Sequence, residues 1–269
     1  MSDENEPLSL FGHVVQPGAL SLFSSTSSEP FGLWALHQDP ELEEDSGIRL
    51  LVDTTNVTAP TDPGTANAAF KLRMEQASKG SSSDTVLHIQ SPSIRKTFIR
   101  SPPDTELELG IKHAYITFQF RSIGRFRPFL FEIGIKDMKG RAGVIRASSF
   151  QSEPKLHLQP TKAKHSTKSN EKLLPTLHLP LTIAAGPKHE ETSLTEWQVL
   201  TLPLSQIARH LSDTSIAKST DVEALSKQER FASFHSISYV KIHANLRLRR
   251  VWCSEHLPDH DLAEFQVFS

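Results

Sequence analysis

The sequence predicts an all-β protein: a single β-sandwich or jelly-roll-like domain over residues 1–269, with one or two short helices and long loop insertions. Short runs of β-type residues bounded by turn residues recur along the whole chain, whereas few segments have helical spacing. No central linker divides the 269 residues, and 37% of them are hydrophobic, which suffices for one core. Many short strands with few helices are typical of sandwiches and jelly rolls.

The predicted strands follow one another along most of the chain, each rich in β-branched, aromatic or leucine side chains. They are Leu20–Phe23, Ile48–Val52, Val86–Ile89, Ile94–Ile99, Tyr115–Phe120, Phe129–Ile135, Val144–Ala147, Leu177–Ile183, Trp197–Leu202, Ile237–His243, Leu246–Trp252 and Phe265–Phe268. The run from Phe129 to Ile135 shows the clearest alternation, since every second residue is apolar. The polar, glycine-containing residues 136–143 then predict a hairpin to the strand at Val144.

Two segments have helical signals. Leu204, Ile207, Ala208 and Leu211 fall at helical spacing and predict one short helix. A second helix is predicted to begin at Thr220, three residues before Glu223, as in a capping box.

Four stretches interrupt the pattern of strands with residues that form loops and linkers. Residues 53–83, 152–172, 185–193 and 212–231 are rich in Ser, Thr, Lys, Glu, Gly or Pro. Surface loops tolerate added length at small entropic cost, so we expect these stretches to be flexible insertions outside the core.

Composition excludes several classes of protein. The net charge is -2 and the isoelectric point is about 6.7, which argues against a surface built wholly for nucleic acid. The single cysteine allows no intrachain disulfide, the first residues are acidic rather than basic and apolar, and no run approaches the roughly 20 apolar residues of a membrane span. We therefore expect a soluble intracellular protein that does not bind membranes.

Several ordered blocks of the chain carry a resemblance to a known family. The segment YVKIHANLRLRRVWCSEHLPDHDLAEFQVF from Tyr239 to Phe268 combines a basic strand with an Ala-Glu-Phe segment. Further blocks are residues 11–34, 86–104, 109–112 and 146–152, so that the matching parts cover roughly half of the chain. Together they resemble the cilia- and flagella-associated family of the doublet-microtubule inner junction, also called the basal-body upregulated family.

The resemblance implies a small β-sandwich that binds rather than catalyses. It implies tubulin and other inner-junction proteins as partners, and the axoneme, basal body and cytoskeleton as the location. The sequence departs from the family at Ser91, Pro92 and Ser93, which replace a Gly-Thr-Asn segment, and at residues 118–128, which are less basic. Contacts made by those positions in the family are not carried over.

A candidate partner-binding strip lies in the segment Lys241–Trp252. Alternation places Ile242, Ala244, Leu246 and Leu248 on one face, which is expected to pack on the core. The other face is predicted to form a cationic ladder for an acidic partner such as tubulin. The ladder comprises Lys241, His243, Asn245, Arg247 and Arg249. The alternative is an ordinary solvated strand face with some internal pairing.

Possible metal ligands lie close together near the end of the chain. Cys253, His256 and His260 form a C-x2-H-x3-H pattern beside Asp259 and Asp261. A structural zinc takes four ligands, and the chain has no second cysteine. We therefore predict no metal and no other cofactor.

Catalytic motifs are missing as well. The sequence contains no G-x-S-x-G elbow, H-E-x-x-H motif or P-loop, so we predict no enzyme activity and no small-molecule substrate. One alternative is a carbohydrate-binding sandwich with Trp34, Trp197 and Trp252 as stacking platforms, although tryptophans beside apolar strands favour the core. Another is a nuclear or cytosolic adaptor of the same family in a cell without motile cilia, with RNA-processing or transcription partners and a nuclear location.

Overall fold

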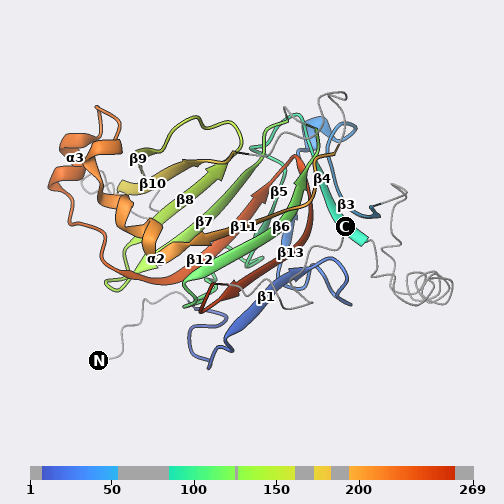
Figure 1. Ribbon diagram of the computed structural model, residues 1–269, viewed down its shortest axis with the longest axis horizontal. Coiled ribbons are helices and arrows are strands. Elements are labelled where there is room, and N and C mark those ends of the chain that lie inside the picture. Colours follow the sequence, from blue (N-terminus) through green and yellow to red (C-terminus); the bar gives the residue numbers. More distant parts are fainter. Residues whose placement is uncertain (1–7, 54–84, 125–126, 161–172, 183–193, 258–269) are drawn as a thin grey trace.

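A computed structural model describes residues 8–53, 85–124, 127–160, 173–182 and 194–257 (Figure 1). Its strands form two sheets that face each other, with the helices α2 (Leu204–Ile207) and α3 (Val222–Lys227) at one end (Figure 1). The all-β sandwich predicted from the sequence is confirmed. Within the described ranges no helix is long and apolar enough to cross a membrane.

The first sheet is six-stranded and antiparallel. Its strands, in spatial order, are β11 (Gln198–Pro203), β6 (Tyr115–Ser122), β13 (Leu246–Ser254), β4 (Thr85–Gln90) and β3 (Gly47–Val52), with β1 (Ala19–Ser24) also paired to β13. β13 is long enough to pair with β4 through its first half and with β1 through its second half. β13 is therefore the central strand of this sheet.

The second sheet is seven-stranded. Its strands, in spatial order, are β2 (Ala35–His37), β5 (Phe98–Ser101), β12 (Phe234–His243), β7 (Leu130–Asp137), β8 (Ala142–Ser148), β10 (Leu173–Pro180) and β9 (Lys155–Pro160). β8 and β10 run parallel, whereas the other pairs are antiparallel.

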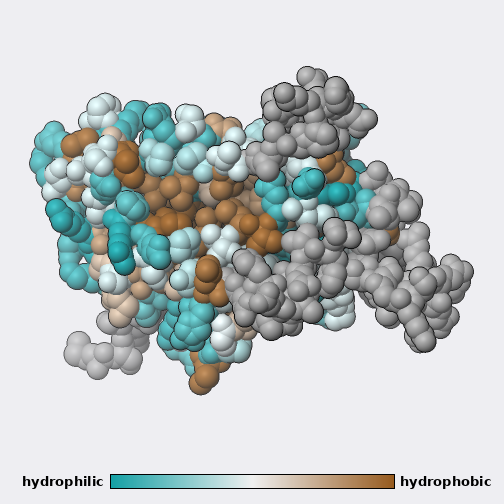
Figure 2. Space-filling model, in the orientation of Figure 1, coloured by the Kyte–Doolittle hydropathy of each residue, from teal (hydrophilic) through white to brown (hydrophobic). Residues whose placement is uncertain are grey.

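Aromatic side chains join the two sheets at the centre of the core. Phe118 of β6 stacks on Phe131 of β7 with 4.4 Å between ring centroids, and Phe120 contacts Phe129 edge-on at 5.3 Å. The alternate residues of the run from Phe129 to Ile135 are wholly buried, as the alternation predicted. Figure 2 shows hydrophobic side chains across the centre of this view, over β8 and β11, which belong to different sheets.

The segment Lys241–Trp252 turns a corner between the sheets. β12 ends at His243 in the seven-stranded sheet and β13 begins at Leu246 in the six-stranded sheet, with a cis peptide between Ala244 and Asn245. The side chain of Asn245 fixes the corner, because its Oδ1 accepts from Ser91 N at 2.8 Å and its Nδ2 donates to Pro128 O at 3.0 Å. The two predicted strands Ile237–His243 and Leu246–Trp252 are therefore confirmed, but they lie in different sheets and do not form one continuous strip.

The helical segments lie near the predicted places. α2 (Leu204–Ile207) continues into the 3-10 helix η2 (Ala208–Ser212), as the spacing predicted, and α3 (Val222–Lys227) begins close to Thr220. The predicted capping box does not form, because Asp221 is the N-cap and makes no side-chain bond there. Two further 3-10 helices are η1 (Pro40–Leu42) and η3 (Thr214–Ile216).

Two of the predicted insertions contain elements of the fold. Residues 152–172 include β9, whose Leu156 is wholly buried. Residues 212–231 include η3 and α3, and Leu225 of α3 joins the core. These residues were predicted to be loops because their polar neighbours dominate the local composition. Residues 54–83, 161–172 and 185–193 and the predicted strand Phe265–Phe268 lie outside the described residues.

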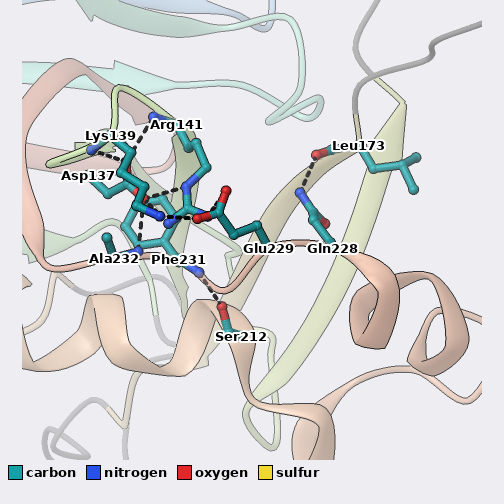
Figure 3. Close-up of polar contacts among 9 residues, drawn as sticks. All are labelled: Asp137, Lys139, Arg141, Leu173, Ser212, Gln228, Glu229, Phe231 and Ala232. Carbon is teal, nitrogen blue, oxygen red and sulfur yellow. Dashed lines mark hydrogen bonds and ion pairs between the residues drawn. The ribbon is translucent and has the colours of Figure 1, made fainter.

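The β7–β8 hairpin is tied to the chain that enters β12 (Figure 3). Asp137 Oδ1 accepts from the backbone nitrogens of Lys139 and Arg141, both at 2.9 Å. Its Oδ2 accepts from Ala232 N at 2.8 Å and from Arg141 Nε at 2.7 Å. Burial raises the pKa of Asp137, but these hydrogen bonds outweigh burial and the pKa is lowered. The carboxylate is therefore a structural anchor.

Candidate interaction surfaces

A row of basic side chains crosses the outer face of the six-stranded sheet. In the strand register Arg121 of β6 lies opposite Arg247 of β13, Arg247 opposite His88 of β4, and His88 opposite Arg49 of β3. Residues directly opposite each other point to the same face of a sheet. Leu246 and Leu248, which flank Arg247, are wholly buried on the core side, so the row points outward.

Asp53 places a carboxylate between two of these arginines. Its Oδ1 accepts from Arg121 Nη2 at 2.5 Å and from Arg247 Nη1 at 2.7 Å. Like charges directly opposite each other destabilise a sheet, so the carboxylate offsets the repulsion of the two guanidinium groups. The side chains of Arg247 and Asp53 are only 6% and 8% exposed. Arg247 is thus an internally bonded group rather than part of an open ladder.

His88 completes the row as a neutral side chain. Burial and, next in size, the charge of Arg247 together lower its pKa to about 4. Arg247 Nε donates to His88 Nδ1 at 3.4 Å, which the neutral ring accepts. The positive charge of this face at pH 7 therefore comes from arginine alone.

Trp197 supports the row from beside β11. The guanidinium carbon of Arg249 lies 4.5 Å from the centre of a Trp197 ring, and that of Arg121 lies 5.3 Å away. Arg249 and Arg250 follow Leu248 at a bulge in β13 and are both half-buried. We call this surface the arginine face, and it comprises Arg49, Arg121, Arg247, Arg249 and Arg250.

A second charged row crosses the outer face of the seven-stranded sheet. Lys241 of β12 lies between Arg100 of β5 and Glu132 of β7 in the register. Glu132 lies opposite Arg146 of β8, and Arg146 opposite His178 of β10. We call these five residues the Glu132 row. Among them Glu132 is the sole carboxylate.

Glu132 is held by three donors. Its Oε2 accepts from Arg146 Nε at 2.7 Å, and its Oε1 accepts from the hydroxyl of Tyr239 at 2.9 Å. Lys241 Nζ lies 3.3 Å from the same Oε1. Burial raises the pKa of this carboxyl, but the charges of Lys241 and Arg146 and the hydrogen bonds outweigh burial and lower the pKa to about 2. Glu132 is therefore ionised throughout the physiological range.

The five predicted partner-binding residues consequently lie in three places. Lys241 belongs to the Glu132 row, whereas Arg247 and Arg249 belong to the arginine face. His243 and Asn245 lie at the corner between the sheets, where both are buried, and His243 Nδ1 donates to Ile94 O at 2.7 Å. The prediction of one exposed ladder is wrong in its geometry. The role of these residues in binding a partner stays a prediction.

Sequence reasoning missed most of both rows. Arg49 and Arg146 lie within predicted strands, Arg121 directly follows the predicted strand Tyr115–Phe120, and Arg250 directly follows the predicted ladder. The alternation along the strands could have indicated the outward direction of these side chains. The order of the strands, which brings them together, depends on contacts between distant parts of the chain. Asp53 was assigned to an insertion.

The predicted absence of a metal site stays a prediction. Cys253 lies in β13 and is wholly buried, and burial raises the pKa of its thiol. His256 is exposed, and His260 lies outside the described residues. Within the described ranges no group of three or more His, Cys, Asp or Glu side chains is placed to hold a metal ion.

The tryptophans are placed mainly as the core prediction expects. Trp34 is buried and its Nε1 donates to Leu22 O at 2.8 Å, and Trp252 is buried as well. Trp197 is half-buried and its rings are contacted by guanidinium groups. A row of exposed tryptophans for sugar stacking is therefore not formed by these three side chains.

The described fold and its surfaces define the chain as a two-sheet β-sandwich with a charged row on each outer face. Residues 70–186 match the CFA20 domain family. The chain is 24% identical over 261 residues to "Cilia- and flagella-associated protein 20" of Chlamydomonas reinhardtii, which covers 96% of this chain and 97% of that relative. It is 23% identical over 261 residues to the protein of the same name from Paramecium tetraurelia, with 96% of each chain covered. These matches support the resemblance to this cilia-associated family that the sequence predicted, at a divergent level of identity.

Proposed function

We propose that this chain is a non-enzymatic structural protein of the cilium that binds tubulin in doublet microtubules, at the inner junction or basal body, through the arginine face. The cilium is suggested by relatives that are named cilia- and flagella-associated protein 20 and that align over nearly the whole chain. The observation that carries the proposal is the concentration of arginine on one sheet face.

Charge complementarity favours tubulin as the partner, because tubulin is acidic. The whole chain has a net charge of -2, yet in the four-strand row of this face a single carboxylate, that of Asp53, accompanies three arginines, Arg49, Arg121 and Arg247. Arginine binds carboxylates through two parallel hydrogen bonds, so it suits such a partner better than lysine.

The arginines divide into supporting and contacting residues. Arg247 and Arg121 are bonded to Asp53 and fix the centre of the row. Arg49 is exposed, and Arg249 and Arg250 are half-buried. The proposal therefore assigns partner contact mainly to the residues around the centre. It assigns to Arg121 and Arg247 the role of orienting the face.

Co-sedimentation with microtubules tests the proposal. The pair Arg49→Glu and Arg250→Glu reverses two charges on the arginine face without touching Asp53. We expect at least about a tenfold loss of affinity, because reversed charges repel an acidic partner. Wild-type binding should also weaken as salt rises, since charges are screened over about 8–10 Å at ordinary ionic strength.

The matched control reverses two exposed charges on the helical end of the molecule. Arg209→Glu and Lys227→Glu change the net charge by the same amount and lie in η2 and α3. We expect this control to bind microtubules like the wild type. A folded Arg49 and Arg250 variant that still binds with unchanged salt dependence would show that the contact lies elsewhere. Equal losses in the test and control variants would show that only net charge matters.

Localisation of the full chain gives an independent test. A fluorescently tagged copy in a ciliated cell should lie along the axoneme or at the basal body. An exclusively nuclear signal in a cell that builds cilia would contradict the proposed location and support the adaptor alternative.

A further inference from the structure

We propose that the outer face of the seven-stranded sheet carries a second docking site, which binds an extended acidic peptide segment of a partner through Lys241 and Arg146. The site lies on the opposite sheet from the arginine face, so it does not depend on the tubulin contact proposed above. It goes beyond that function because it predicts a second occupied surface.

The charge of the Glu132 row supports an acidic occupant. Arg100, Lys241 and Arg146 face a single carboxylate, that of Glu132, so positive charge remains after Glu132 is paired. His178 adds no charge at pH 7, because burial and the charge of Arg146 lower its pKa to about 4. The next cation along the face, Lys136, is already paired with Glu108 at 2.7 Å.

Lys241 and Arg146 flank Glu132 on the neighbouring strands and keep donors for a ligand. Lys241 and Arg146 bind different oxygens of the same Glu132 carboxylate. Arg146 uses its Nε for that bond, and its terminal nitrogens form no hydrogen bond with any described residue. Both side chains are 27% exposed. The terminal fork of Arg146 is therefore available for a two-bond contact to a second carboxylate.

Aromatic rings hold Lys241 in position. Its Nζ lies 5.3 Å from the centre of Phe98 and 5.4 Å from that of Tyr239. The Tyr239 ring in turn covers Gly134, where a Cβ would come within 2.2 Å of the ring. The tyrosine hydroxyl donates to Glu132. Because these contacts fix the cations before binding, little side-chain entropy is lost when a partner docks.

The shape of the row favours a peptide over a small anion. The cations occupy β5, β12 and β8, and adjacent strands are spaced by about 4.8 Å, so the charges form a line across an open sheet face. Acidic side chains on one side of an extended chain repeat about every 6.6–6.8 Å, which lets successive carboxylates reach Lys241 and Arg146. A line of donors on an open face suits such a segment.

Fluorescence anisotropy with a labelled oligoglutamate peptide tests the site in the full chain. The Arg49→Glu and Arg250→Glu variant serves as background, because it reverses two charges of the arginine face and so weakens peptide binding there. We expect Lys241→Gln in this background to weaken peptide binding at least about fivefold. Arg146→Lys, which keeps the charge but loses the fork, should weaken it less. The control Lys136→Gln makes the same charge change on the same face and should leave binding unchanged.

Carbodiimide cross-linking of the peptide to the wild-type chain provides a readout that does not depend on how the variants fold. Mass spectrometry should find the cross-link on Lys241. Cross-links confined to other lysines, or unchanged affinity in a folded Lys241→Gln variant, overturn the proposal. Tighter binding of a mixed-sequence DNA oligonucleotide through the same residues overturns the assignment to an acidic peptide.

The two proposals fail in different assays. Lys241→Gln alone should leave microtubule co-sedimentation unchanged if the arginine face binds tubulin. Loss of oligoglutamate binding together with intact co-sedimentation supports the second site. Intact co-sedimentation of the Arg49 and Arg250 variant refutes only the proposed function.

Discussion

Replacing Glu132 by glutamine should destabilise the fold by an amount that depends on pH. The substitution keeps the size of the side chain but removes the charge that Arg146 and Lys241 bind. The pKa of Glu132 falls from 4.5 to about 2 on folding, and one pKa unit corresponds to about 1.4 kcal/mol. The difference between these two pKa values thus corresponds to about 3 kcal/mol of stability. The side chain is almost wholly buried, so solvent screens this interaction little.

The direction of the pH dependence follows from the lowered pKa. A carboxyl group whose pKa is lower in the folded state contributes its full stability above the unfolded pKa, here about 4.5, and loses it as the pH falls through about 2. At pH 3 the same two pKa values leave less than half of the contribution. The wild type and the Glu132→Gln variant should therefore differ most near neutral pH and converge in acid.

Urea denaturation of both proteins at pH 7 and pH 3 measures this difference. The free energies of unfolding should differ by about 3 kcal/mol at pH 7 and by about half of that or less at pH 3. The control Glu229→Gln removes an exposed carboxylate that pairs with Lys139 and Arg141 and should change stability little at either pH. A Glu132→Gln difference that is the same at both pH values would refute the assignment of the stability to the ionised carboxylate.

Two further predictions concern stability. Asp53→Asn should cost about 3–5 kcal/mol of stability, because it leaves the charges of Arg121 and Arg247 opposite each other without a carboxylate between them. Adding Arg247→Met should recover part of this loss. Thermal unfolding measures both variants, and a double variant less stable than the single one would contradict this explanation. Leu156→Ala should cost about 2–5 kcal/mol of stability through lost burial and the cavity left behind, although the sequence around β9 predicts a loop. A change below about 1 kcal/mol in urea unfolding would mean that β9 contributes little to the core.

The sequence predicted where the strands lie more reliably than which strands lie next to each other. In the run from Phe129 to Ile135, alternation identified the core face correctly because burial of every second side chain is a local property of a strand. The same reasoning identified the buried side chains around Leu246 and Leu248. It did not reveal the corner at Asn245, because the contacts that fix it, to Ser91 and Pro128, come from distant parts of the chain.

β9 shows a different limit of sequence reasoning. In this strand only Leu156 is wholly buried, and the remaining side chains are half-buried or exposed. A strand at the edge of a sheet has few buried positions, so its pattern resembles that of the polar residues beside it. Here the partial burial is completed by the segment after η3, since Lys218 N donates to Leu156 O at 3.0 Å. Such cover from a distant segment leaves no signal in the strand itself.

Two carboxylates, those of Asp53 and Glu132, explain how a chain of nearly balanced charge keeps a cationic row on each outer face. Asp53 pairs with Arg121 and Arg247, which lie on the adjacent strands β6 and β13. Glu132 pairs with Lys241 and Arg146, which lie on the two strands that flank β7. A shift of one residue in the strand register would turn Glu132 toward the core and separate it from Arg146, so the ion pairs disfavour the wrong register as well as offsetting repulsion. Each row needs a single carboxylate for this purpose. The remaining positive charge is then available to a partner, and its positions are fixed by the same register that forms the sheets.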